Sequence, residues 1–446
     1  MTGHTLQDVF EHGLDAFCRG RELHPREWRA ASSIRYCYTP AMGSHVQACL
    51  AGDYSQQFFH ACRHRSCPRC ADSARAAWID AQLQRLLPCS HFHVVFTWPH
   101  SLLALWELNR AWCTKLLFDC ARSSLLQLMA DPRHLGAMPG LLMSLHTWGR
   151  TLSHHPHLHC LVSAGGLTPE QRWKDAKPGW LLPLAPLKAL FRGKLLDALW
   201  RALDSHRLHM PAWSTTQSWH LQIKRLYRKH CNLEIRPPYA SGRGVALYLA
   251  RYAKGGPLPA SRALRVHSDH VYFDYTDHRD ERVKTLKLQT SEFISRVLWH
   301  AAPRGVHTTR HAGLYSSSHL ALNELARSAL QARSTPCAWP RPTTITRAPR
   351  PSSRCPNCQG PLLRLAGLAR RLPSRPHTHQ RGEISLLRRA SATREGHSPA
   401  PPPPTSAARG PTGRSNGHAQ AGLPDRPAHI GHPAPGGRAA LPGRAA

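Results

Sequence analysis

The chain has 446 residues and carries 59 Lys and Arg against 26 Asp and Glu, a formal charge of +33. So large a positive excess indicates a polyanionic partner, with nucleic acid first and an anionic membrane surface second. No apolar run approaches the roughly 18 residues of a membrane span, and the N-terminus lacks the apolar stretch of a secretion signal, so we expect a cytoplasmic protein whose cysteines are reduced.

A cluster of cysteines and histidines lies near the N-terminus. Its sharpest element is Cys67-Pro68-Arg69-Cys70, a CxxC turn that lets two thiolates face one tetrahedral zinc ion. The expected ligands of a structural zinc ion are Cys49, Cys62, Cys67 and Cys70, and His45, His60 and His64 could substitute. The alternative is a redox pair, but such a pair usually lies between a strand and a helix of a compact α/β unit.

Beyond this cluster, the spacing of apolar residues predicts interleaved helices and strands. Residues 71–88 and 102–130 have helical spacing, and HFHVVFTW has the pattern of a strand. The further expected elements are strands at GLLMSLHTW and HLHCLVSA, a helix at 184–204, strands at SWHLQIKRL and NLEIR, a helix near 243–254, and short strands at 262–267, 270–275 and 284–289. Short links between neighbouring strands favour an α+β fold with a central, mostly antiparallel sheet flanked by helices.

Two histidines, His157 and His159, open one of the apolar strands. Alternation along a strand places both imidazoles on one face of the sheet, with Leu158 behind them. Two neutral imidazoles side by side can hold a divalent metal ion, which polarises a phosphate oxygen as a Lewis acid. His91-Phe92-His93 has the same spacing, so in a chain with 32 His the pattern by itself is weak.

Two tyrosines, Tyr248 and Tyr252, lie four residues apart in the segment GRGVALYLARYAK. On a helix this spacing places both phenols on one face, and Arg251 and Lys254 add positive charge for DNA. A phenol beside a metal-bound phosphate is an in-line nucleophile that can form a covalent phosphotyrosine. The alternative is an amphipathic helix whose tyrosines pack at the edge of the core.

The C-terminal part of the chain contains a second CxxC, Cys355-Pro356-Asn357-Cys358. Only Cys337 lies near it in sequence and a fourth ligand is missing, so it is half of a zinc ribbon and metal binding there stays open.

Residues 371–446 lack Lys, Phe, Tyr, Trp, Cys, Met and Val. Such a composition buries too little apolar surface to offset ordering, so we expect a disordered basic tail. It either binds DNA loosely or has no selected role.

Six segments, taken in order, carry a family resemblance. They are RSCPRC, HFHVVFTWPHSL, LHTWGRTLSHHPHLHCLVSAGGL, WKDAKPGWLLPLAPLKALFRGK, GVALYLARYAKGGP and RHAGLY, and they fall within residues 30–320. Together they resemble the insertion-sequence-ninety-one (and ISCR) transposases, which are rolling-circle enzymes of the HUH, two-tyrosine type. Two positions depart from the family pattern: Leu50-Ala51-Gly52 follows Cys49 where the family often has CxxCG, and Ala312 replaces a usual tyrosine.

The resemblance implies roles for particular residues. His157 and His159 would bind Mg²⁺ or Mn²⁺, Tyr248 and Tyr252 would cut single-stranded DNA, and the N-terminal cysteines would hold zinc. The His91-Phe92-His93 segment matches only the leading strand of the family, so it is set aside as a ligand pair. The third ligand of the catalytic metal stays open between His146 and a polar residue on the tyrosine helix.

The resemblance also implies an architecture. The expected parts are a zinc-binding module with its linking helix at 1–88, an HUH catalytic domain at 89–335, a partial zinc knuckle at 336–370 and the tail at 371–446. The implied function is a bacterial, nucleoid-associated transposase that nicks and rejoins single-stranded DNA at insertion-sequence ends through a 5′-phosphotyrosine. Because that bond stores the energy, no nucleotide cofactor is expected.

Two other functions remain as alternatives. The first is a non-catalytic zinc-dependent DNA-binding protein or an inactive transposase relic, in which the histidines and tyrosines only pack. The second is a hydrolytic nuclease with two metal ions, which would need clustered carboxylates. No acidic residue lies beside His157 or His159 in the sequence, so the nuclease is the weakest of the three hypotheses.

Overall fold

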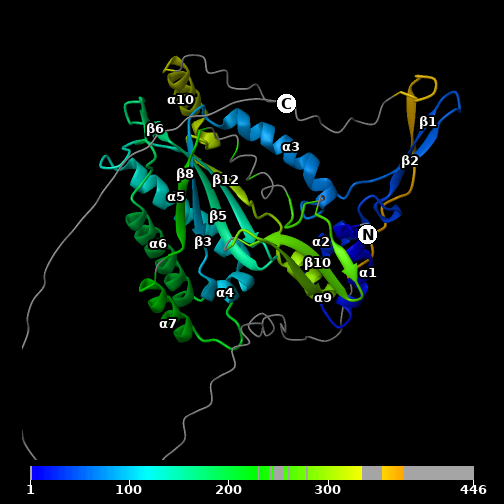
Figure 1. Ribbon diagram of the computed structural model, residues 1–446, viewed down its shortest axis with the longest axis horizontal. Helices are drawn as coiled ribbons and strands as arrows, with labels where there is room; N and C mark the ends of the chain where they lie inside the picture. Colours follow the sequence, from blue (N-terminus) through cyan, green and yellow to red (C-terminus); the bar gives the residue numbers. More distant parts are fainter. Residues whose placement is uncertain are drawn as a thin grey trace, which may run out of the picture. The chain divides into compact units, whose positions relative to one another are not determined.

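The structure is a computed structural model that describes residues 3–229, 231–240, 244, 249, 255–259, 262–277, 280–333 and 354–375. These residues form an α+β fold around a five-stranded antiparallel sheet (Figure 1). Its strands, in spatial order, are β12 (Thr309–Gly313), β4 (Gly140–Trp148), β5 (His154–Ser163), β3 (His91–Thr97) and β8 (Leu233–Tyr239). The predicted fold class is confirmed.

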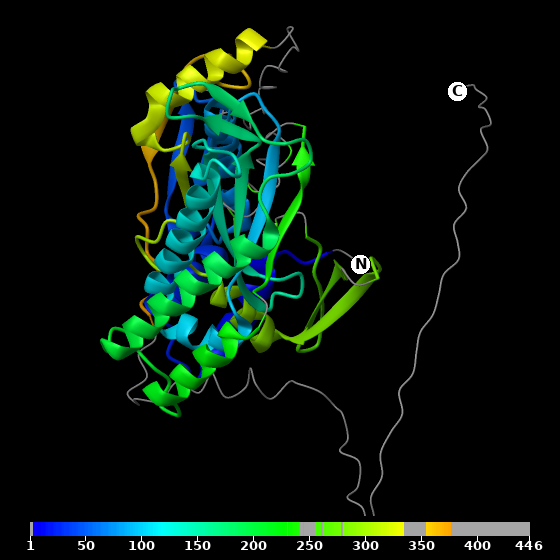
Figure 2. The same cartoon turned by 90° about the vertical axis from the view of Figure 1, so that its left-hand side faces the viewer.

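One face of this sheet is covered by helices, onto which Figure 2 looks. They are α4 (Leu103–Leu108), α5 (Arg110–Ala130), α6 (Leu184–Asp204) and α7 (Thr216–Tyr227). The segment SWHLQIKRL was predicted to be a strand, and this prediction is wrong because it lies in α7. Thr215 and Ser218 form a capping box at the helix start, and the buried Trp219 and Ile223 lie four residues apart. Leu221, which strand alternation would bury with them, is 51% exposed.

The opposite face of the sheet is covered by α3 (Pro68–Arg85) and α10 (Leu320–Arg333). Their apolar residues form a second core with Leu142 of β4 and Leu161 of β5. The remaining small pieces are a hairpin of β6 (Gly165–Leu167) and β7 (Trp173–Asp175), and the short 3-10 helices η1 (Pro40–Met42), η2 (His100–Leu102) and η3 (Ser317–His319). The face beneath α3 is the one that carries the histidines considered below.

A separate three-stranded sheet packs with the N-terminal helices. Its strands are β9 (Arg265–His267), β10 (His270–Thr276) and β11 (Val283–Gln289), close to the predicted ranges, and they are followed by α9 (Thr290–Trp299). Helices α1 (Leu6–Cys18) and α2 (Pro25–Tyr36), which are not among the elements predicted from the sequence, share one core with β10 and α9. Part of the expected 1–88 module therefore shares its core with residues 264–301.

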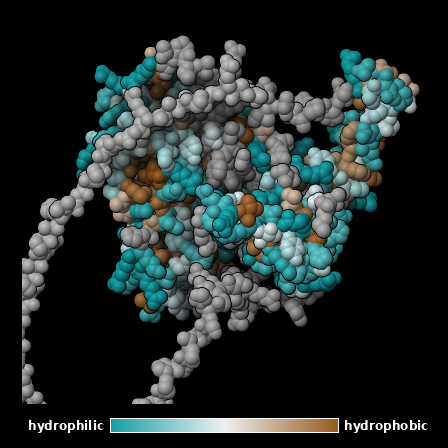
Figure 3. Space-filling view, in the orientation of Figure 1, coloured by the Kyte–Doolittle hydropathy of each residue, from teal (hydrophilic) through white to brown (hydrophobic). Residues whose placement is uncertain are grey.

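A third sheet joins the two ends of the described chain. β13 (Leu362–Ala366), from the expected 336–370 knuckle, pairs antiparallel with β1 (Ser44–Cys49), which also pairs with β2 (Ser55–Phe59). The described surface in Figure 3 is mostly hydrophilic, with scattered hydrophobic residues. Within the described part of the chain, no helix is both long enough and apolar enough to span a bilayer. Residues 376–446, most of the expected tail, lie outside the described residues.

Candidate metal centres

Three histidines converge on one face of the central sheet. His146 comes from β4, and His157 and His159 come from β5. His146 is the direct cross-strand partner of His157, while Ser144 faces His159. One ring nitrogen from each histidine lies within 4.8 Å of the others. The structure thus brings together the predicted pair and one of the two residues proposed as the third ligand.

Hydrogen bonds orient two of these rings. The Nδ1 atom of His157 lies 2.5 Å from the backbone oxygen of His155, so Nδ1–H donates and the Nε2 lone pair is left for a metal. The Nδ1 atom of His159 lies 2.7 Å from Nε2 of His93. For His159 to bind a metal through Nε2, its Nδ1 must donate to His93. Such outer partners set the orientation of metal ligands. His93, which the sequence pattern left without a ligand role, therefore lies in direct contact with His159.

The environment keeps the three imidazoles neutral. Burial, aided by the neighbouring imidazoles, holds the pKa of His146 and of His159 well below the ordinary value. Burial also lowers the pKa of His157 to about 4. The neutral imidazole is the form that ligates metals, so near neutral pH no proton has to leave before an ion binds. This donor set fits a divalent cation.

The other histidine of the leading strand has a different role. His91 is fully buried, and its Nε2 lies 2.6 Å from the hydroxyl oxygen of Tyr315. The same hydroxyl oxygen accepts a hydrogen bond from the backbone N–H of Leu87 at 3.2 Å. These contacts join β3 to the segment after β12 within the core. The two histidines of the HFH segment therefore make different contacts. His91 binds Tyr315 within the core, whereas His93 contacts His159 of the histidine cluster.

The predicted nucleophiles Tyr248 and Tyr252, with Arg251 and Lys254, lie outside the described residues. Their described neighbour Leu249 is fully buried in one core with Leu142 and Leu161. Leu142 lies four residues before His146 on β4, and Leu161 lies two residues after His159 on β5, so both share the face of the histidines. Leu249 accordingly lies over the same face of the sheet as the histidine cluster.

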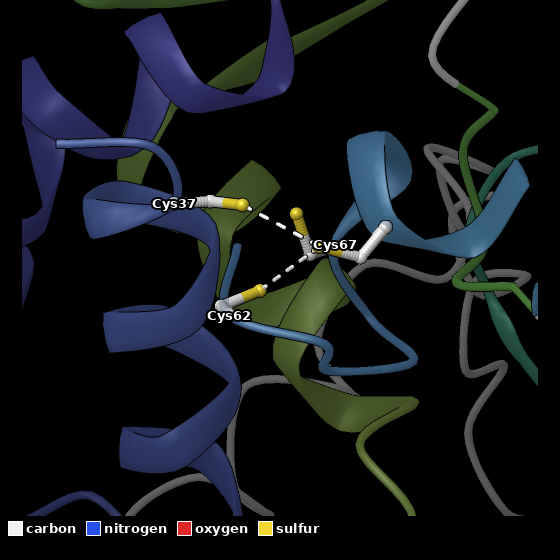
Figure 4. A group of neighbouring side chains, drawn as sticks. Cys37, Cys62 and Cys67 are labelled. Carbon is white, nitrogen blue, oxygen red and sulfur yellow. Dashed lines mark hydrogen bonds between the residues drawn. The ribbon is translucent and has the colours of Figure 1, made fainter. Parts of the chain in front are cut away.

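Four cysteines converge at the start of α3, as Figure 4 shows for three of them. They are Cys37, Cys62, Cys67 and Cys70. The Sγ atom of Cys70 lies 3.5 Å from that of Cys37 and 3.6 Å from that of Cys62. Cys37 directly follows α2, and its neighbours in this cluster come from the loop before α3 and from the first turn of α3. Four thiols in one closed group are the donor set of a structural zinc site.

This group corrects the ligand set expected from the sequence. Cys49 was expected to join Cys62, Cys67 and Cys70, but it ends β1 and lies beside Cys358, with their sulfur atoms 3.2 Å apart. Cys37 stands in its place. No local signal distinguished Cys37, because only the packing of α2 brings it to the CxxC turn. The substitutes His45 and His60 contact each other, with Nδ1 and Nε2 3.2 Å apart.

A loop residue connects the cysteine cluster with the histidines. Arg65, between Cys62 and the CxxC turn, donates to the hydroxyl of Thr308 at 2.7 Å. Its positive charge contributes to the lowered pKa of His146.

Two family models match the parts of the chain that contain these groups of side chains. A family model described as "Transposase zinc-binding domain" matches residues 9–98, and one described as "Putative transposase" matches residues 140–321. The chain is 34% identical over 325 residues to "Putative transposase y4qJ" of Sinorhizobium fredii, covering 71% of this chain and 82% of that protein. It is 29% identical over 313 residues to "Transposase for insertion sequence element IS801" of Pseudomonas savastanoi pv. phaseolicola, covering 66% and 72% respectively. No solved structure matches the chain.

The fold, the cysteine cluster and these matches define a transposase, a DNA-processing enzyme with a zinc-binding domain near its N-terminus. The chain belongs to the insertion-sequence-ninety-one family of transposases. DNA is accordingly its partner, in agreement with the charge of +33.

Proposed function

We propose that this transposase nicks and rejoins single-stranded DNA at insertion-sequence ends by tyrosine attack beside a divalent metal ion. The observation that carries the proposal is the group of three neutral imidazoles on one sheet face, with Leu249 of the tyrosine segment buried over that face. The histidine group can hold a cation, and the chain segment with two tyrosines supplies candidate nucleophiles.

In this proposal His146, His157 and His159 hold Mn²⁺ or Mg²⁺, which when bound withdraws electron density from the scissile phosphate. The phenol oxygen of Tyr248 or Tyr252 attacks phosphorus, giving up its proton. The new bond is a 5′-phosphotyrosine, and the bond from phosphorus to the 3′ oxygen breaks. That oxygen takes up a proton and leaves as a free 3′-hydroxyl. Because one ester replaces another, rejoining needs no ATP.

Zinc has a structural role in the same proposal. Cys37, Cys62, Cys67 and Cys70 would hold one zinc ion and thereby fix the loop that carries Arg65. Phosphate contacts by Arg251, Lys254 and the surplus of basic residues would supply affinity that falls steeply with salt. The zinc module with its basic flanks is the part proposed to recognise the element ends. Exchanging it for the module of a relative should transfer the preference for ends.

The test uses purified protein, Mn²⁺ and end-labelled single-stranded DNA from the flanks of its own coding region. On a denaturing gel the label should migrate with the protein, and this adduct should disappear when Tyr248→Phe and Tyr252→Phe are combined. Single changes then order the two tyrosines. Tyr227→Phe, at an exposed tyrosine on α7, is the matched control and should leave the adduct intact. Salt-sensitive binding without an adduct would instead support the non-catalytic DNA-binding protein.

A further inference from the structure

A second group of metal-ligand side chains lies where the two ends of the described chain meet. It consists of Cys49, Asp53, Cys355 and Cys358, whose ligand atoms lie within 4.8 Å of one another. The sulfur atoms of Cys49 and Cys358, which are 309 residues apart in the chain, lie 3.2 Å apart. The Sγ atom of Cys355 lies 3.3 Å from Oδ1 of Asp53. Cys49 and Asp53 on one side, and Cys355 and Cys358 on the other, are thus brought together only by the fold.

The loops that carry these side chains have the local geometry of metal-binding turns. The backbone N–H of Ala51 donates to Sγ of Cys49, and that of Asn357 donates to Sγ of Cys355, both at 3.4 Å. A hydrogen bond to sulfur favours the thiolate, which is the form that binds metal. The first cysteine group has the same feature, because the N–H of His64 donates to Sγ of Cys62 at 3.4 Å.

The two loops also turn back on themselves and hold each other. Gly52 has a φ angle of +73° and Gln359 one of +60°, so each loop reverses through a left-handed residue. The side-chain amide of Asn357 donates to the backbone oxygen of Asp53 at 2.7 Å. All four candidate ligands are therefore presented from two turns that are joined directly.

The sheet that ends in these turns lacks an apolar core of its own. Along β13 the first residue is half-buried and the other four are exposed, and β2 has no buried residue. Leu363 and Leu365 are 45% and 48% exposed. Small sheets with so little burial are marginally stable unless something else ties the strands together. A bound metal ion supplies that stabilisation in small modules.

We propose that Cys49, Asp53, Cys355 and Cys358 bind a second structural zinc ion, separate from the one assigned to the Cys37 group. Three thiolates and one carboxylate are a tetrahedral zinc donor set, and the thiolates disfavour Mg²⁺ and Ca²⁺. Residues 354–375 are then part of the zinc-binding module, although they follow the catalytic sheet in the chain. This site is independent of the nicking chemistry, since it makes no use of the histidines or tyrosines.

The first experiment counts zinc in the full chain by native mass spectrometry. The unaltered protein should hold two zinc ions, and the double variant Cys355→Ser, Cys358→Ser should hold one. Cys231→Ser, at a half-buried cysteine outside both groups, is the control and should keep two. Asp53→Cys should retain the second ion and, with Co²⁺ in place of zinc, strengthen the thiolate-to-cobalt absorption. A count of one in the unaltered chain would overturn the proposal.

The second experiment needs no variant, so it is informative even if the double variant misfolds. Cys358 is exposed and should react quickly with iodoacetamide if no metal protects it. The proposal predicts that Cys49, Cys355 and Cys358 stay unmodified in the native protein and become modified together after a strong zinc chelator is added. Rapid modification of Cys358 before chelation, or a disulfide between Cys49 and Cys358 in peptide mapping under non-reducing conditions, would refute a second zinc ion.

Discussion

The sharpest test of the histidine centre is a change at His93, which is not a proposed metal ligand. His93→Phe removes the acceptor that lies 2.7 Å from Nδ1 of His159. The buried Nδ1–H of His159 then lacks this partner, which costs about 1–3 kcal/mol. Loss of such an outer partner typically lowers metal affinity about 10- to 100-fold, equivalent to about 1.4–2.8 kcal/mol. The two estimates agree, so we expect Mn²⁺ affinity to fall within that range.

The assay is Mn²⁺ binding by calorimetry, together with adduct formation at limiting and at saturating Mn²⁺. His93→Phe should lose most adduct at limiting Mn²⁺ and recover part of it at saturation. His93→Gln, whose amide oxygen can accept the same hydrogen bond, should retain most of the affinity. The Mn²⁺ affinity retained by His93→Gln distinguishes an orienting role of His93 from simple disruption of the core.

The matched control is His91→Phe, on the same strand and the same face. His91 contacts Tyr315 and the backbone oxygen of Cys89 instead of the cluster. This change should lower the free energy of unfolding while leaving Mn²⁺ affinity within about twofold. If His91→Phe and His93→Phe weakened Mn²⁺ binding equally, or if His93→Phe left it unchanged, the orienting role assigned to His93 would be refuted.

Three further predictions follow from contacts elsewhere in the described chain. Tyr315→Phe deprives the N–H of Leu87 and the ring of His91 of a buried partner, so urea unfolding should show a loss of about 2–3 kcal/mol; a change below about 0.5 kcal/mol would contradict that role. Cys37→Ser should remove one zinc ion from the chain whereas Cys113→Ser, at a cysteine in the main core, should remove none, and equal zinc counts would contradict the corrected ligand set. Ending the chain after residue 375 should keep the contacts of Arg371 with Ala41 and of Arg375 with Glu22, whereas ending it after residue 353 deletes β13 and should lower the thermal unfolding midpoint. Equal midpoints for the two truncations would show that β13 contributes nothing to stability.

Patterns that depend on near neighbours in the chain were accessible from the sequence. The predicted helix at 184–204 has the bounds of α6, and the expected strands at 140–148 and near 157–164 are β4 and most of β5. The shared face of His157 and His159 follows from the two-residue period of a strand. The strand prediction for SWHLQIKRL was wrong because the spacing of its apolar residues fits both a strand and a helix. The capping box at the start of the segment favours the helix.

Contacts between distant segments were decided by the tertiary structure. Alternation could put His146 and His93 on a sheet face, but only the order β4-β5-β3 places them on either side of β5, where they meet His157 and His159. The exchange of Cys37 for Cys49, and the meeting of Cys49 with Cys358, likewise depend on the packing of α2 and on the pairing of β1 with β13. A local spacing rule describes which side of an element a residue occupies. The neighbour that it meets there is set by how the elements pack, because the free energy of burial depends on the whole core and not on the separation along the chain.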